Sequence, residues 1–165
     1  MLDQLKPKIL GPSDGDTGFL TVIGVRFMVS GKESGGGFAL VEHPMPPRAL
    51  GAPLHRHNQE DEYSYVLEGR IGALLGDEVI YGNVGDLIFK PRGQWHTFWN
   101  ADDEPARILE IISPAGFEQY FREMVALPQD ATSADRAAIA TRYALDVDPE
   151  SVPRLISEYG LRLSR

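Results

Sequence analysis

The sequence predicts an all-β fold, a barrel or sandwich of short strands, followed by a helical extension at the C-terminus. Between Phe38 and Ile112, β-branched and aromatic residues form short runs separated by Gly, Pro, Asn and Asp. After Ile112, apolar residues instead recur at the spacing of an amphipathic helix. The length of 165 residues suits one domain with a sizeable core.

The first segments lead into the barrel. Residues 1–17 are rich in Gly, Pro, Asp and Ser, so we expect an extended N-terminal arm. Leu20–Val29 are apolar on both faces, which predicts one buried strand. Residues 31–37 end in three consecutive glycines and predict a loop. We therefore place the barrel at residues 18–112 and the extension at residues 113–165.

Two alternating histidines mark the next strand. His55 and His57 are two residues apart, so both side chains point to one face of a strand while Arg56 points to the other. The polar residues 58–61 favour a turn. Glu62 then begins a new strand, and we expect its carboxylate to face the interior.

A third histidine, His96, follows a return path of short strands. Ile71–Leu75 and Val79–Tyr81 predict a hairpin with a tight turn, and a further strand is expected at residues 87–89. Proline and glycine then redirect the chain, so that His96 lies near the start of a strand over Trp95–Trp99.

These three histidines and Glu62 form a candidate metal site. Imidazole and carboxylate are the ligands expected for a first-row transition metal. Four protein ligands leave positions on a six-coordinate ion for water, substrate or dioxygen. We therefore predict that His55, His57, Glu62 and His96 bind one divalent metal, with Glu62 also the candidate catalytic residue.

Strand alternation also predicts a substrate pocket. Two residues share the face of His96 and two share the face of Glu62. The predicted pocket residues are Ser64, Val66, Phe98 and Asn100. An apolar pocket with few polar groups suits an aromatic or enolic molecule better than a sugar. For Phe98, ordinary core packing is an equally good interpretation.

Three other titratable residues are interpreted as structural. His43 directly precedes a proline and has no partner at ligand spacing, which indicates a surface or loop histidine. Glu60 and Asp61 lie in the polar turn and are interpreted as solvated acids.

The C-terminal third predicts three helices. Ser113-Pro114 looks like the N-cap and first turn of a helix whose apolar stripe runs from Phe117 to Val125. A second helix is expected from Ser133 to about Leu145, and a third near Ser151. The extension is either a lid over the barrel mouth or a cover for apolar sheet surface or a subunit partner.

Composition narrows the classes of partner. The formal charge of −8 argues against nucleic acid and anionic membrane, which bind clustered Lys and Arg. Without cysteine there is neither a disulfide nor a thiolate metal site. No stretch has the length of a membrane span, and the first residues lack the apolar core of a secretion signal. We therefore expect a cytoplasmic protein with a small-molecule substrate.

Together, the two histidine segments resemble the motifs of the cupin superfamily. The first, His-x-His-x(3,4)-Glu-x6-Gly, is matched by His55, His57, Glu62 and Gly69, and the second by Gly85, Pro91, Gly93, His96 and Asn100. Ala49 departs from the pattern, since a glycine usually precedes the first histidine by six residues. The resemblance covers about residues 37–112 and implies a double-stranded β-helix (jelly-roll) barrel with one divalent metal: Fe, Mn, Ni, Co, Cu or Zn.

Among cupins, the chain is most similar to the small quercetin-dioxygenase-like proteins. The similarity lies in Leu67-Glu68-Gly69, Pro91-Arg92-Gly93 and residues 113–118. It implies a dioxygenase-like oxidoreductase that acts on a small enolic or aromatic molecule, with Glu62 able to act as base. The same ligands serve isomerases, decarboxylases and lyases, and a non-catalytic small-molecule-binding cupin is a further alternative.

Single-barrel cupins commonly pair through their sheets. The outward positions Tyr63, Tyr65 and Leu67 are apolar enough to need a cover, either from a second subunit or from the helix at residues 117–125. We expect a homodimer.

Overall fold

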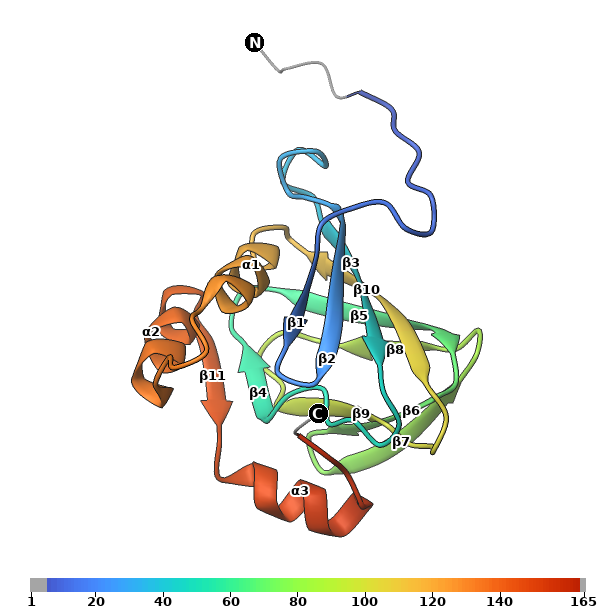
Figure 1. The fold of residues 1–165 in the computed structure, drawn as a ribbon, viewed down its shortest axis with the longest axis vertical. Helices are drawn as coiled ribbons and strands as arrows, with labels where there is room; N and C mark the ends of the chain where they lie inside the picture. Colours follow the sequence, from blue (N-terminus) through green and yellow to red (C-terminus); the bar gives the residue numbers. More distant parts are fainter. Residues whose placement is uncertain (1–5, 164–165) are drawn as a thin grey trace.

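Two antiparallel sheets pack face to face (Figure 1). The computed structural model describes residues 6–163, so residues 1–5 of the predicted arm lie outside the described residues. One sheet has the order β1-β2-β3-β10-β5-β8 and the other the order β11-β4-β9-β6-β7. From β3 onward the chain crosses repeatedly between the sheets, as in a jelly roll. The predicted jelly-roll barrel with C-terminal helices is confirmed.

The elements are short. The strands are β1 Thr17–Leu20, β2 Ile23–Val29, β3 Ala39–Met45, β4 Leu54–His57, β5 Asp61–Glu68, β6 Arg70–Leu75, β7 Glu78–Asn83, β8 Leu87–Lys90, β9 His96–Asn100, β10 Ala106–Ser113 and β11 Leu145–Asp148. The helices are α1 Glu118–Ala126, α2 Ser133–Arg142 and α3 Ser151–Tyr159. Residues 6–16 form no strand or helix. The predicted hairpin is confirmed, since β6 pairs with β7 in antiparallel register.

The barrel core follows from strand alternation. Along β10, Ala106, Ile108, Glu110 and Ile112 are buried, while the residues between them are partly exposed. Strands β5 and β8 alternate in the same way, with their buried side chains directed into the barrel. Most inward residues are apolar, and several of the polar exceptions build the site described below.

The strand expected at Leu20–Val29 is confirmed over Ile23–Val29 (β2), but Leu20 belongs to β1, which forms a hairpin with β2. The turn lies at Thr21-Val22, and Thr21 has a φ of 63°. The turn residues carry none of the usual glycine or asparagine signals, and a β-branched residue rarely adopts this left-handed conformation. The sequence therefore contains no local indication of the turn.

The start of the first helix also differs from the prediction. Ser113 is the last residue of β10, where it pairs with Asp61 across the sheet. The helix α1 begins at Glu118 with Phe117 as its N-cap residue. Ser113 therefore extends the ladder of β10 instead of capping the helix.

The second helix begins at Ser133 as predicted but ends at Arg142. Ala144 has a left-handed φ of 50°, and Leu145–Asp148 form the additional strand β11. This strand pairs with β4, so the C-terminal extension completes the sheet that carries His55 and His57. A strand of four residues gives too little periodicity to be recognised beside a helix.

The third helix covers the outer face of β9. Trp99 stacks on Tyr159 with a distance of 4.4 Å between ring centroids, and it shares a buried cluster with Leu155. Gly72 lies directly against Trp99, where an added Cβ would lie 2.3 Å from the indole. Only glycine fits at that position.

The outward residues of β5 are not covered by α1. This helix packs against β1, β3 and α2. Tyr63 stacks on Phe89 of the edge strand β8, while Tyr65, Leu87 and Phe89 are exposed. The helix therefore packs on the barrel as predicted but does not cover the outward residues of β5, and the homodimer stays a prediction. Among the described residues, no helix is long and apolar enough to cross a membrane.

Candidate metal centre

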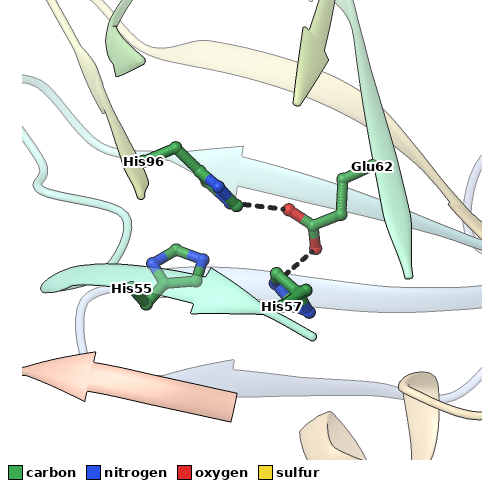
Figure 2. Close-up of side chains that lie close together, drawn as sticks. All are labelled: His55, His57, Glu62 and His96. Atoms are coloured by element: carbon green, nitrogen blue, oxygen red, sulfur yellow. Dashed lines mark hydrogen bonds and ion pairs between the residues drawn. The ribbon is translucent and has the colours of Figure 1, made fainter. Parts of the chain in front are cut away.

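The four predicted ligands meet inside the barrel. His55 and His57 project from β4, His96 from the adjacent strand β9, and Glu62 from β5 in the opposite sheet. Figure 2 shows the three imidazoles grouped around the Glu62 carboxylate. All four residues are buried, and one potential ligand atom from each lies within 4.8 Å of the others. The cluster therefore bridges the two sheets.

Backbone carbonyls orient two of the imidazoles. His55 Nδ1 is 2.8 Å from the Pro53 carbonyl oxygen, and His96 Nδ1 is 3.0 Å from that of Gln94. A carbonyl can only accept, so each Nδ1 carries the hydrogen and each Nε2 carries a lone pair. His96 Nε2 lies 3.2 Å from Glu62 Oε2 (Figure 2). Both rings thus present a ligand nitrogen.

His57 lies between two carboxylates. Its Nε2 lies 3.3 Å from Glu62 Oε1, while its Nδ1 lies 3.6 Å from Glu60 Oε2. Both Nδ1 and this Oε2 are buried and lack a hydrogen-bond partner within residues 6–163. The reading of Glu60 as a solvated acid is therefore wrong: it faces the histidine from outside the cluster, as carboxylates do behind metal-binding histidines. Asp61 instead pairs with Arg92 near the surface.

The electrostatics match the forms that bind metal. Burial lowers the pKa of His55 well below its usual value, and it lowers the pKa of His96 as well. Burial alone would raise the pKa of Glu62, but His57, Lys90 and His96 together hold it well below its usual value. Neutral imidazoles at His55 and His96 and an ionised carboxylate at Glu62 suit a divalent transition metal.

A buried ion pair that sequence reasoning missed lies behind Glu62. Lys90 Nζ is 3.0 Å from Glu62 Oε2 and 3.0 Å from Glu110 Oε1. Ser64 Oγ donates to Glu110 Oε2 at 2.7 Å. The available signal was alternation, because Lys90 shares the inward face of Ile88.

Lys90 and Glu110 shift each other's pKa. Burial raises the pKa of Glu110 to about 7, although Lys90 opposes the shift. Burial opposes the charge of Lys90, but Glu110 and Glu62 raise its pKa above the usual value. The Lys90 ammonium thus contacts two carboxyl groups: that of Glu62, whose pKa is lowered, and that of Glu110, whose pKa is raised.

A cavity of about 70 Å³ adjoins the cluster. His55, His57, Glu62 and Glu110 form part of its wall. The apolar wall includes Phe98, Phe117, Tyr120, Phe121, Leu145 and Val147. Phe117 also lies against His57, with 4.2 Å between ring centroids. The C-terminal extension therefore closes one side of the cavity.

Of the four predicted pocket residues, the structure brings only Phe98 to this cavity. The Ser64 hydroxyl donates its hydrogen bond to Glu110, and Val66 packs in the apolar core. The Asn100 amide donates to the backbone carbonyls of Pro46 and Glu104. Alternation identified the correct inward face for these three residues, but they lie elsewhere along the barrel. A role for any of the four in substrate binding stays a prediction.

His43 contradicts its interpretation as a surface histidine. It is 2% exposed, lines the cavity, and its Nδ1 lies 2.9 Å from the Gly24 carbonyl oxygen. The strand β3 continues through Pro44 to Met45, so the proline does not end it. His43 therefore sits within an inward-facing row.

Comparison with known families and proteins gives consistent matches. Residues 42–112 match the family described as Cupin domain. Oxidoreductase iacF of Pestalotiopsis fici is 44% identical over 50 residues, which is 30% of this chain and 24% of that protein. Tetracenomycin polyketide synthase protein TcmJ of Streptomyces glaucescens is 33% identical over 60 residues, or 36% of this chain and 40% of that protein. The chain spans less than half the length of these curated relatives.

Solved structures share the fold. KdgF from Halomonas sp. has a TM-score of 0.59 at 19% identity, covering 69% of this chain and 99% of its own. Pac13 from Streptomyces, a nucleoside dehydratase, has a TM-score of 0.56 at 14% identity, covering 69% of this chain and 88% of its own. A predicted oxalate decarboxylase from Thermotoga maritima has a TM-score of 0.53 at 20% identity, covering 56% and 80%.

Proposed function

We propose, since this chain carries a cupin domain over residues 42–112, that it is a metal-dependent enzyme acting on a small enolic or aromatic molecule by dioxygenase-like oxidoreductase chemistry. The observation that carries the proposal is the buried cluster of His55, His57, Glu62 and His96, whose ligand atoms lie within 4.8 Å of one another. Its donor set, neutral imidazole and ionised carboxylate, fits one divalent transition metal.

A divalent ion held there, of Fe, Mn, Ni, Co, Cu or Zn, would supply Lewis-acid polarisation and, if redox-active, access to dioxygen chemistry. The protein's own groups supply the rest. Glu62 is ionised and faces the cavity, so it can accept the proton of an enol or phenol. Lys90 fixes the orientation of this carboxylate from 3.0 Å.

The cavity supports an organic substrate with little polarity. Aromatic side chains at Phe98, Phe117 and Phe121 exclude water from one side of the cluster. A flat enolic or aromatic ring fits this lining better than a sugar does.

A second candidate function is proton transfer without dioxygen, as in an isomerase, decarboxylase or lyase. Glu110 lines the same cavity, and its pKa of about 7 contrasts with that of the ionised Glu62. Two carboxyl groups with separated pKa values can serve as acid and base. Binding without turnover is the outcome expected if neither chemistry is found.

The test begins with metal content. Protein purified without added metal is analysed by plasma mass spectrometry beside the His57→Ala variant. We expect about one divalent ion per chain in the wild type and a strong loss in the variant, and equal contents would refute the site. Oxygen uptake with a panel of enols and flavonols then supports the dioxygenase, whereas deuterium exchange into the substrate without oxygen uptake supports the second candidate.

A further inference from the structure

A fourth histidine lines the cavity without belonging to the metal cluster. His43 projects inward from β3, in the sheet that also carries Glu62 and Glu110. Its ring contacts Phe121 edge to face at 5.3 Å and Phe98 at 6.4 Å between ring centroids. The residue thus forms a polar position within the aromatic part of the wall.

The hydrogen bond of His43 defines its tautomer. Nδ1 lies 2.9 Å from the Gly24 carbonyl oxygen, which can only accept, so Nδ1 carries the hydrogen. Burial lowers the pKa of His43 to about 4, so the ring is neutral at neutral pH and Nε2 carries a lone pair. Within residues 6–163, Nε2 has no hydrogen-bond partner. A ligand in the cavity that His43 lines can supply a donor to this free acceptor.

We propose that His43 Nε2 accepts a hydrogen bond from a hydroxyl group of the substrate. The cavity would then select molecules that carry an enolic, metal-binding group at one end and a hydrogen-bond donor at the other. Binding of the enolic group to the metal rests on the proposed function, whereas the hydrogen bond to His43 requires no metal. His43 is accordingly a specificity-determining residue.

Two hydroxypyranones provide matched probes. Kojic acid and allomaltol share one enolic chelating group, but kojic acid has a hydroxymethyl group where allomaltol has a methyl group. Zinc-loaded wild type, His43→Asn and His43→Gln are titrated with both by calorimetry. The Asn amide can replace Nδ1 and keep the bond to Gly24, whereas the Gln amide oxygen extends to the position of Nε2.

We expect the wild type to bind kojic acid about tenfold more tightly than allomaltol. His43→Asn should lose this preference, and His43→Gln should retain it. Zinc content and allomaltol affinity control for folding in each variant. Equal binding of the two probes by the wild type, or a preference that survives in His43→Asn, would overturn the proposal.

Nitrogen NMR on the wild type decides the matter if a variant fails to fold. The His43 Nε2 resonance should move upfield with kojic acid and not with allomaltol; no selective shift would overturn the proposal. A wild type that takes up no zinc refutes the proposed function separately. The same resonance is then followed in metal-free protein, where phenol should shift it and anisole, which has no donor, should not.

Discussion

The neutral state of buried His43 predicts a defined loss of stability in acid. Its pKa falls from 6.5 to about 4 in the folded protein because of burial. The unfolded chain therefore takes up a proton near pH 6.5, while the folded chain does so only near pH 4. This residue's contribution is fully present above pH 6.5 and is lost as the pH falls toward 4.

The magnitude follows from the two pKa values. One pKa unit corresponds to about 1.4 kcal/mol, so His43 should account for a loss of about 2 kcal/mol in unfolding free energy between about pH 7.5 and about pH 5. The Asn side chain does not titrate, so the His43→Asn variant should lack this loss of unfolding free energy. Removing the ring also costs packing against Phe98 and Phe121, but that cost is the same at both pH values and cancels.

Urea denaturation of both proteins at the two pH values measures the difference, with a chelator present so that bound metal does not contribute. His55 and His96, whose pKa values are also lowered, titrate in both proteins and cancel to first order. If both proteins lose the same free energy, His43 is already protonated or open to water in the folded state, and the reasoning fails.

Three further predictions concern the support of the cluster and assembly. Glu60→Gln should weaken metal binding about 10-fold to 100-fold in a chelator competition, because Glu60 faces His57 Nδ1 at 3.6 Å, whereas Asp61→Asn should not; equal affinities would remove Glu60 from the site. Truncation after Ile112 removes β11 from beside β4 and should lower metal content measured by mass spectrometry, and a fully loaded truncated chain would contradict this support. Light scattering at micromolar concentration should show a homodimer, since Tyr65 remains exposed on β5, and a strict monomer would refute it.

The sequence by itself determined the strands that carry the metal ligands and which of their faces points inward. His55 and His57 lie on one face because strand side chains alternate, and Glu62 faces inward after a polar turn. These features depend on residues close together in the chain. Local periodicity and turn chemistry were therefore enough to assemble the ligand set.

Tertiary structure alone decided what stands behind the ligands. The His43 ring hydrogen-bonds to the Gly24 carbonyl, Lys90 forms ion pairs with both Glu62 and Glu110, and β11 pairs with β4. Each of these contacts links segments that are distant in sequence. Alternation tells which face a side chain occupies, but not which strand lies opposite it or how far along the barrel it sits. A buried polar residue and an exposed one have the same local pattern until a partner strand supplies the hydrogen bond or counter-charge that makes burial tolerable.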